Sequence, residues 1–573
     1  MGKHSVRLVR AAVLAVASAA LLLALSGVEG HAQGRGAAEW TTSSFDAQRS
    51  GWLRADARLT KDAVQKGEFA FLWKMKIENT SRQLNSLTAP VLLDRLIGYR
   101  GFKSLAFVGG SDDRIFAVDT DLARASWTTV LNYTAPTGGR PPSSWNCPGG
   151  LIAMPSRRTA LVPSAGVSGP GGGRAGVRNG SAVGEPGRGA AVLSQMPARG
   201  AAPAPPPPAP ASGRGPAPIG FGGVDPLFVV GGDGYLHSLY VSNGSPIEPA
   251  MPFLPPDSKP TALIWVDGVI YTTTSGECGA APNAVWAMDL NKPAGERKAQ
   301  VWKAGRASIA GSSGVSFGTD GTIYVALGTA AQGAPHADSI VALDRYTLIP
   351  KDWFTAPGAD FNATPIVFRQ GSRDLIAAPA NDGRLYLLDG ASLGGGDHKT
   401  SLASTAKYTT AGAGTGLATF QDDSGGRWIF TTASATTGPG SDVTFTQNGP
   451  ASSGRIVAFK VIEEGGQLSL APAWQSLDVA SPLAPIVVNG MVFAVSSGEY
   501  RGPASPPLTA AQRAQRSMPA VLHVLDAATG RALWSSGTTI TSFARGELSA
   551  GGGQVYVVTY DNHLYAFGIP LEH

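Results

Sequence analysis

The chain has 573 residues, with 43% hydrophobic and 15% charged side chains. This length can hold several ordinary domains or one large repeat domain, and it can bury a large core. The formal net charge of +5 has a local origin, because most of the excess lies in the first ten residues and in a low-complexity stretch between Arg174 and Arg214. The remainder is nearly neutral, which excludes the basic face that a nucleic-acid-binding protein needs.

The first 32 residues have the layout of a cleavable secretory signal. Lys3, Arg7 and Arg10 precede an apolar run at 11–25, and small residues follow up to Ala32. Because the run is shorter than the roughly 20 residues that span a bilayer, a membrane anchor is the weaker interpretation. We therefore expect cleavage after Ala32 and an exported protein, periplasmic or secreted, with no membrane span after cleavage.

An N-terminal arm is expected at 33–66, and a strand-like segment follows it. This segment, FAFLWKMKI at 69–77, carries a tryptophan and precedes the repeats described next.

From Leu105 to Gly568 the chain repeats one pattern eight times. An apolar segment ends near glycine, and a second segment, usually ending in aspartate, follows some ten or more residues later. The first members are LAFVGG, LFVVGG, VIYTTT, TIYVAL, LIAAPA, WIFTTA, MVFAVS and QVYVVT, and the second are RIFAVD, YLHSLY, AVWAMD, SIVALD, RLYLLD, RIVAFK, VLHVLD and HLYAFG. Self-similarity of this kind indicates a repeat architecture.

Each repeat can be extended to four short strands. A segment of small and then apolar residues precedes each pair, and a strand with tryptophan follows most pairs, as in ARASWTTV and RALWSS. Four short strands separated by Gly, Asp and Asn turns are typical of a propeller blade. The sequence predicts an all-β fold, an eight-bladed β-propeller at 67–573, with seven blades as the alternative if one weak repeat is a decorated loop.

The last repeat lacks a fourth strand of its own. Segment 69–77 has the pattern of that outer strand, so pairing it with the last repeat would close the ring. Closure matters because an unpaired edge strand is an aggregation hazard. We expect the N-terminal strand to close the last blade.

Two insertions interrupt the predicted propeller. Residues 156–222 are rich in Gly, Ala and Pro, a composition that buries too little apolar surface to offset chain entropy. We expect a disordered insertion within the second blade. Residues 501–518 are expected to form a surface loop with a helical patch at 508–516.

Cys147 and Cys278 are the only cysteines. In an oxidising compartment such a pair can form one disulfide. The alternative is two unrelated buried thiols, because the sequence does not fix their separation in space.

Three segments resemble the repeats of the pyrroloquinoline quinone (PQQ) β-propeller family. They are GGDGYLHSLYVSNGSPI at 231–247, NDGRLYLLDGASLGG at 381–395 and VLHVLDAATGRALWSS at 521–536. The segment FDAQRSGW at 45–52 similarly resembles the N-terminal arm of such propellers.

The turn in the last of these segments has a clear physical logic. Asp526 can cap the turn with its side chain, Gly530 can supply a positive φ, and Trp534 can pack between neighbouring blades.

The resemblance implies the fold more strongly than an activity. The superfamily includes PQQ-dependent alcohol and sugar dehydrogenases, and also outer-membrane assembly propellers that bind partners without chemistry. In the dehydrogenases PQQ lies over the central channel, usually under a disulfide between adjacent cysteines, with calcium held by Glu, Asn and Asp and an Asp as base. Cys147 and Cys278 lie 131 positions apart and cannot form that motif, and we assign no catalytic or metal-binding residues.

Propeller geometry indicates where a site would lie. The innermost strand of each blade runs along the channel, and the loop before it opens on one rim. These loops offer cations for carboxylates and oxygens for a metal, as an acidic quinone would require; the alternative is ordinary turn polarity. The candidate cofactor-binding residues are Arg82, Asn85, Ser86, Asn146, Ser312, Asn362, Thr415, Arg545 and Glu547.

Two functions fit these observations. The first is an exported binding or scaffold propeller that takes a protein partner or a small-molecule ligand at its rim. The alternative is a divergent PQQ-dependent dehydrogenase that oxidises an alcohol or sugar with PQQ and calcium. In either case we expect a monomer that binds no nucleic acid.

Overall fold

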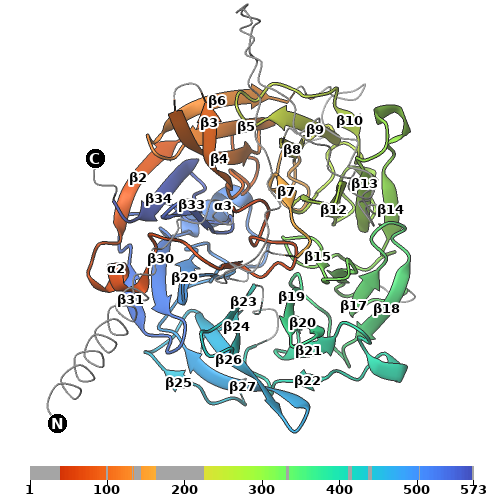
Figure 1. Ribbon diagram of the computed structural model, residues 1–573, viewed down its shortest axis with the longest axis vertical. Coiled ribbons are helices and arrows are strands. Elements are labelled where there is room, and N and C mark those ends of the chain that lie inside the picture. The colour runs from red at the N-terminus through yellow and green to blue at the C-terminus, as the bar shows by residue number, and fades with distance from the viewer. Residues whose placement is uncertain are drawn as a thin grey trace, which may run out of the picture. The chain divides into compact units, whose positions relative to one another are not determined.

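The computed structural model describes residues 39–98, 101–131, 133, 143–162, 225–330, 334–410, 414, 416–435, 442–502 and 504–570. The predicted signal at 1–32 and most of the insertion at 156–222 lie outside the described residues. Within them, eight sheets stand in a ring around a central axis, each sheet forming one blade (Figure 1). The prediction of an eight-bladed propeller is confirmed.

The first four blades follow the chain from the N-terminal side. Blade 1 contains β3 (Val91–Gly98), β4 (Gly101–Gly110), β5 (Arg114–Asp119) and β6 (Arg124–Val130). Blade 2 contains β8 (Pro226–Val230), β9 (Tyr235–Tyr240) and β10 (Met251–Pro252). Blade 3 contains β7 (Arg158–Thr159), β11 (Ile264–Val266), β12 (Val269–Thr274), β13 (Ala284–Asp289) and β14 (Gln300–Lys303). Blade 4 contains β15 (Ser316–Phe317), β16 (Ile323–Ala326), β17 (Ser339–Leu343) and β18 (Pro350–Thr355).

The other four blades complete the ring. Blade 5 contains β19 (Ile366–Gln370), β20 (Arg373–Pro379), β21 (Leu385–Asp389) and β22 (Ala403–Ser404). Blade 6 contains β23 (Leu417–Gln421), β24 (Arg427–Ala433), β25 (Thr446–Gln447), β26 (Arg455–Glu464) and β27 (Gln467–Gln475). Blade 7 contains β1 (Trp52–Leu53), β28 (Ile486–Val488), β29 (Met491–Ser496), β30 (Val521–Asp526) and β31 (Ala532–Ser535). Blade 8 contains β32 (Ser549–Gly551), β33 (Gln554–Val558), β34 (His563–Gly568) and β2 (Ala70–Lys76).

The described residues contain two α-helices and three short 3₁₀ helices. Helix α2 (Lys61–Gln65) lies in the arm and α3 (Ala510–Arg516) lies in the insertion after β29. The capping box of Thr509 and Gln512 starts α3 by satisfying amide groups that the first turn leaves free, and the predicted helical patch is confirmed. The 3₁₀ helices are η2 (Cys278–Ala280), η3 (Ala294–Glu296) and η4 (Gly395–Asp397). Among the described residues no helix is long and apolar enough to cross a membrane.

The second and third strands of each blade form the core. All six residues of β12 and of β29 are buried, because neighbouring blades cover both faces of these strands. A strand buried on both faces is apolar along its whole length rather than at alternate positions. This explains why the repeated segments are continuous apolar runs in the sequence.

Blade 2 departs from the predicted four-strand pattern. The expected first strand at 149–154 does not form, because Gly149 and Gly150 both have positive φ, 66° and 81°, which an extended strand does not allow. A Cβ on Gly150 would also lie 2.0 Å from the carbonyl oxygen of Ser111. The ladder is reduced to one bridge, between Ser156 and Phe228.

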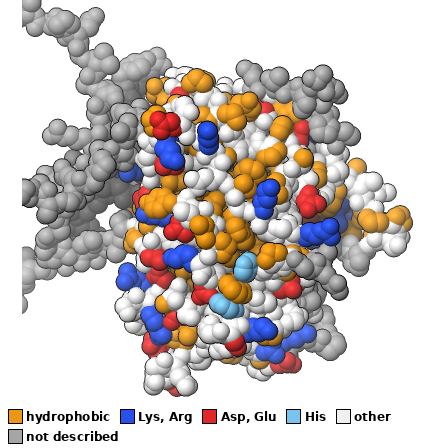
Figure 2. Space-filling view, turned by 90° about the vertical axis from the view of Figure 1, so that its right-hand side faces the viewer, with side chains coloured by type: hydrophobic (Ala, Val, Ile, Leu, Met, Phe, Trp, Pro, Cys, Tyr) orange, Lys and Arg blue, Asp and Glu red, His pale blue; other side chains and the backbone are white. Residues whose placement is uncertain are grey.

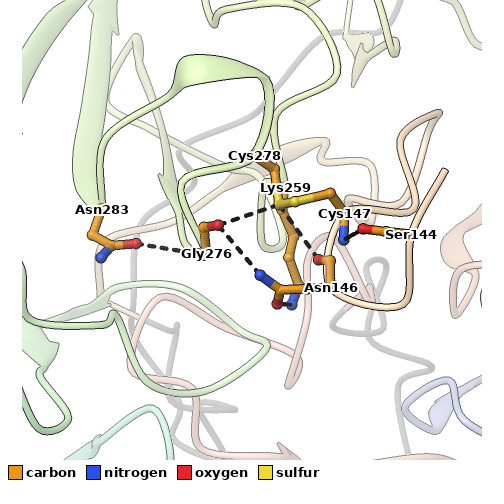
Figure 3. The surroundings of a disulfide bond; sticks show 7 residues. All are labelled: Ser144, Asn146, Cys147, Lys259, Gly276, Cys278 and Asn283. Carbon is orange, nitrogen blue, oxygen red and sulfur yellow. Dashed lines mark hydrogen bonds between the residues drawn. A yellow bond between two sulfur atoms is a disulfide. The ribbon is translucent and has the colours of Figure 1, made fainter. Parts of the chain in front are cut away.

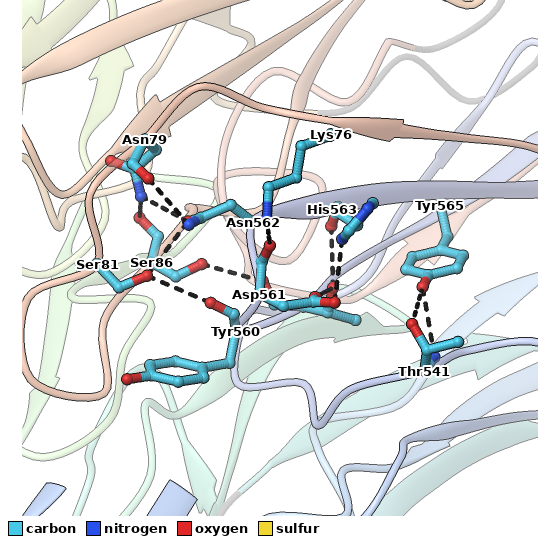
Figure 4. A network of polar contacts seen from close by, with 11 residues as sticks. Lys76, Asn79, Ser81, Ser86, Thr541, Tyr560, Asp561, Asn562, His563 and Tyr565 are labelled. Atoms are coloured by element: carbon cyan, nitrogen blue, oxygen red, sulfur yellow. Dashed lines mark hydrogen bonds and ion pairs between the residues drawn. The ribbon is translucent and has the colours of Figure 1, made fainter. Parts of the chain in front are cut away.

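The N-terminal strand β2 closes the ring, as predicted. It pairs antiparallel with β34, from Ala70 opposite Gly568 to Lys76 opposite His563. A second set of contacts locks the loop after β2 to the turn before β34 (Figure 4). Asn79 and Asn562 exchange two hydrogen bonds, of 2.7 and 2.9 Å. Both ends of the propeller are therefore held in blade 8.

The arm before β2 crosses the centre of the ring (Figure 1) and is buried along most of residues 40–53. Its polar groups bond to each of the eight blades or to the segment that joins them, which satisfies backbone groups that would otherwise be buried unpaired. The arm carbonyls of Trp40, Thr41, Ala47, Gln48, Ser50 and Gly51 accept from the amides of Leu92, Arg157, Phe317, Val367, Thr419 and Val487, respectively. Thr42 Oγ1 donates to Leu263 O, and Asp56 Oδ2 accepts from Gly553 N.

Outer-strand tryptophans join neighbouring blades. Trp127 Nε1 of blade 1 donates to Val241 O just after β9, and Trp474 Nε1 of blade 6 donates to Ala527 O just after β30, both at 2.9 Å. The ring of Trp534 lies between blades 7 and 8, with its centroid 4.8 Å from that of Phe69 and 5.7 Å from that of Phe567. The predicted packing of Trp534 is confirmed.

The outer edge of the ring is mixed in character. On the side drawn in Figure 2, acidic and basic side chains alternate with hydrophobic ones. The outer strands and their turns leave apolar side chains such as Val301, Tyr346 and Ile349 exposed.

The contact of Gly530 with Trp474 gives a first prediction. Gly530 has φ +73°, and a Cβ there would lie 2.4 Å from the Trp474 ring. Gly530→Ala combines backbone strain with overpacking and should lower the free energy of unfolding by about 2–4 kcal/mol. Gly537→Ala is the control, because Gly537 also has positive φ (+53°) but open space around it, so only the strain of about 1 kcal/mol applies. Equal losses in urea unfolding would contradict the interblade contact.

Buried His523 gives a second prediction. Burial lowers the pKa of His523 to about 4, and its Nε2 lies 3.2 Å from Ser496 Oγ. The unfolded chain takes up the proton first, near pH 6.5, so stability from the neutral ring is complete above that pH and is lost as pH falls toward 4. Between pH 7.5 and 5 this should cost about 2 kcal/mol. His523→Gln should reduce the pH dependence of the free energy of unfolding by that amount, as measured by urea unfolding at several pH values. Equal pH dependence in the variant and the wild type would contradict the prediction.

Candidate functional site

A cavity of about 460 Å³ lies at the rim loops of five blades. It is bounded mainly by the segments that precede the innermost strands of blades 1, 2, 3, 4 and 8, and the arm adds Ser43. Because these segments start next to the central channel, residues far apart in the chain meet there. Its volume falls within the range of small-molecule sites.

Glu547 is held by hydroxyl groups on one side of this cavity. Glu547 Oε1 accepts hydrogen bonds from Ser312 Oγ (2.7 Å) and Ser313 Oγ (3.0 Å), and Oε2 accepts one from Ser43 Oγ. These three hydrogen bonds come from two different segments of the chain. The arm and blade 4 therefore fix this carboxylate of blade 8 in place.

Arg49 is a buried cation of the arm near this carboxylate. Its Nε donates to Val315 O (2.9 Å), and Nη1 donates to Ser43 O (2.7 Å) and Thr42 Oγ1 (2.8 Å). Burial lowers the pKa of Arg49 to about 10, while the charges of Glu547 and Asp46 raise it. The guanidinium remains a cation at neutral pH.

Arg545 belongs to a cluster of arginines around one buried carboxylate. Glu499, whose side chain is 2% exposed, receives Arg545 Nε at 3.2 Å and Arg501 Nε at 3.3 Å, and Arg513 Nη1 lies 4.0 Å away. The Arg513 guanidinium also lies over the Trp145 ring at 4.5 Å, a cation–π arrangement. The insertion after β29 thus brings α3 against the edge of the cavity.

Lys259 brings a further positive charge to the cavity wall. Its Nζ donates to Asn146 Oδ1 at 3.4 Å, and Asn146 Nδ2 donates to Gly276 O at 3.3 Å. Cys147 and Cys278 form a disulfide that fastens the Asn146 loop to the loop after β12 (Figure 3). A covalent clamp therefore holds the partner of Lys259.

The structure brings together most of the residues that the sequence singled out. Asn85, Ser86, Ser312, Arg545 and Glu547 line the cavity. Arg82 and Asn146 lie in adjoining loops, Arg82 in backbone pairing with Asn85 and Asn146 in contact with Lys259. Asn362 does not line this cavity, and Thr415 lies outside the described residues.

Four important residues were not singled out from the sequence. Lys259 stands before the innermost strand of blade 3, so the rule that selected the other rim loops applies to it equally. Ser43 and Tyr560 also line the cavity. Ser43 belongs to the arm, and Tyr560 belongs to the turn before β34, next to blade 1. Glu499 follows a second strand rather than preceding a first one, and no sequence signal points to it.

The residues present do not fit the calcium–quinone centre that the family resemblance implies. Calcium needs several oxygen ligands from the protein, and Glu547 is the only carboxylate among the cavity-lining residues. In the described part of the chain no group of three His, Cys, Asp or Glu side chains could hold a metal ion. The disulfide joins residues 131 positions apart rather than adjacent ones.

Comparisons with known proteins agree on the fold. Residues 501–569 match the family described as outer membrane protein assembly factor BamB. Quinohemoprotein alcohol dehydrogenase from Comamonas testosteroni superposes with a TM-score of 0.54 at 12% identity, covering 95% of this chain and 82% of that one. A europium-containing methanol dehydrogenase superposes with a TM-score of 0.52 at 10% identity, covering 93% and 98%. No curated protein matches the sequence.

These likenesses are to proteins of one architecture. The repeats, the eight blades and the closing strand all agree with it. The chain therefore has the fold of the PQQ-type β-propellers, and its residues 501–569 carry that family's repeat.

Proposed function

We propose that the protein is an exported binding propeller that takes its ligand in the cavity at the rim loops. The observation that carries this proposal is the convergence of five blades and the arm on one cavity of about 460 Å³ with charged side chains in its wall. Binding sites are commonly concave, with a few placed polar groups. Residues drawn from so many rim loops favour a ligand site over ordinary turn polarity.

A binding role accounts for the polar groups better than quinone chemistry does. Glu547 accepts from three serine hydroxyls, which occupies most of the oxygen lone pairs that a metal ligand would need free. The adjacent cysteines of the dehydrogenase pattern are absent from the sequence. The alternative, a divergent PQQ-dependent dehydrogenase, is supported by the fold and by the cations Lys259 and Arg545, which could face quinone carboxylates.

Export is part of the proposal. The layout of residues 1–32 supports it, and so does the disulfide between Cys147 and Cys278, because disulfides persist in oxidising compartments.

A titration of the mature chain, residues 33–573, with PQQ distinguishes the binding function from the dehydrogenase function. Calorimetry with and without calcium should show no calcium-dependent, one-to-one binding, and dye-linked assays with alcohols and sugars should show no activity. We expect no calcium-dependent binding because the cavity lacks the set of oxygen ligands that calcium needs.

Calcium-dependent capture of PQQ at one per chain, together with dye-linked activity, would overturn the binding function. In that case Arg545→Ala and Glu547→Ala would locate the centre: loss of the reconstituted activity would place it in this cavity. Unchanged activity would place it elsewhere.

A further inference from the structure

The cavity edge concentrates positive charge beyond what its carboxylates balance. Lys259, Arg501, Arg513 and Arg545 gather there, and the carboxylates that face them are Glu499 and, across the cavity, Glu547. Like charges within a few ångströms repel strongly where water is partly excluded. Glu547 also faces the buried Arg49, so the described side chains of this region leave an excess of positive charge.

Among these cations, Lys259 has the least negative charge from the protein near it. Its Nζ donates to the neutral amide of Asn146, at 3.4 Å, and no carboxylate of the described residues lies within ion-pair distance of it. Burial lowers the pKa of Lys259, and the charge of Arg545 lowers it further. Protein interiors normally pair a partly buried ammonium group, so the missing partner points to a bound anion.

Arg545 is only partly compensated by the protein. Burial is the largest cause that lowers its pKa; Arg501 and Arg513 act in the same direction, and Glu499 opposes them. Its side chain remains 35% exposed, and it lines the same cavity as Lys259. Three arginines share one carboxylate, which leaves guanidinium donors available to a ligand.

We propose that the cavity binds a small dianion, carrying two carboxylates or one phosphate, at Lys259 and Arg545 without a metal ion. The inference rests on the proposed binding function and names its ligand class. A ligand with two negative charges can face both Lys259 and Arg545, the two cations that line the cavity. Guanidinium and ammonium groups are the usual donors to carboxylates and phosphates, and a volume of about 460 Å³ suits a small molecule.

The disulfide gives Lys259 its position. Cys147 follows Asn146 directly, and Cys278 lies two residues after Gly276, whose carbonyl accepts from Asn146 (Figure 3). Asn146 is therefore a positioning residue that acts through Lys259.

The first experiment titrates the mature protein with inorganic phosphate and with succinate, separately, by calorimetry in low-salt buffer freed of metal ions. We expect one-to-one binding of at least one of the two anions. The anion that binds shows whether the site recognises a phosphate or a pair of carboxylates. Acetate, with a single charge, should bind at least tenfold more weakly, because it cannot engage both cations. Absence of binding by both dianions would overturn the inference.

Variants test whether Lys259 binds the dianion. Lys259→Gln should weaken binding of the bound dianion at least tenfold, the scale of one lost charged hydrogen bond. Lys303→Gln is the matched control, because Lys303 is an exposed lysine on the outer strand of the same blade, and its affinity should stay within twofold of wild type. Equal losses in both variants would show general charge attraction and would overturn the proposal.

Asn146→Ala tests the positioning role without touching the disulfide. Affinity for the dianion should fall several-fold, and added salt should weaken binding by the same factor as in wild type, because Lys259 keeps its charge but loses its support. Unchanged affinity would remove Asn146 and the disulfide from the proposal. These titrations use no PQQ or calcium, so their failure is distinguishable from failure of the binding function.

Discussion

The pairing of β2 with β34 is the constraint on which the rest of the molecule depends. A ring of eight sheets has one seam, and here the seam lies where the last strands of blade 8 meet β2 and the loop that leads from β2 to blade 1. Strand β2 and the loop after it hold both sides of it, through the ladder from Ala70 to Lys76 and the contacts of Asn79 with Asn562. The arm adds hydrogen bonds to each blade or to the segment that joins it to the next, so the blades are also held by the arm.

The candidate site lies on that same seam. Ser86, which lines the cavity, donates to Thr559 O at 3.0 Å across it, and Tyr560 of the same turn donates to Gln83 O at 3.2 Å. The wall of the cavity is thus formed by the contacts that close the ring. Cavity shape and ring closure are coupled, because loosening the seam would separate the loops that carry Asn85 and Arg545.

Much of the fold could be predicted from the sequence because most middle strands are buried on both faces and so appear as apolar runs. Turn chemistry was also readable, since Gly530 has the expected positive φ and Asp526 Oδ1 accepts from the amides of Ala528 and Thr529. The first strand of blade 2 could not be predicted correctly, because glycine at 149 and 150 matches both a small strand residue and a turn. Only the packing of Gly150 against Ser111 decides between them.

The site was predictable in part for a similar reason. Residues in the loops before the innermost strands, such as Asn85 and Glu547, follow from the repeat once a propeller is assumed. Lys259 obeys the same rule, but its lack of a carboxylate partner is a property of three-dimensional surroundings. Ser43 and Glu499 depend on the path of the arm and of the insertion after β29, and neither path is encoded in the repeat.

We interpret the uncompensated positive charge at the cavity edge as the mark of a dianion site. A crystal structure of the mature protein grown with selenate would locate a bound dianion, because the selenium gives an anomalous signal. We expect an anomalous peak within hydrogen-bonding distance of Lys259 Nζ and the Arg545 guanidinium. A map with selenate bound at other sites and none in this cavity would contradict it.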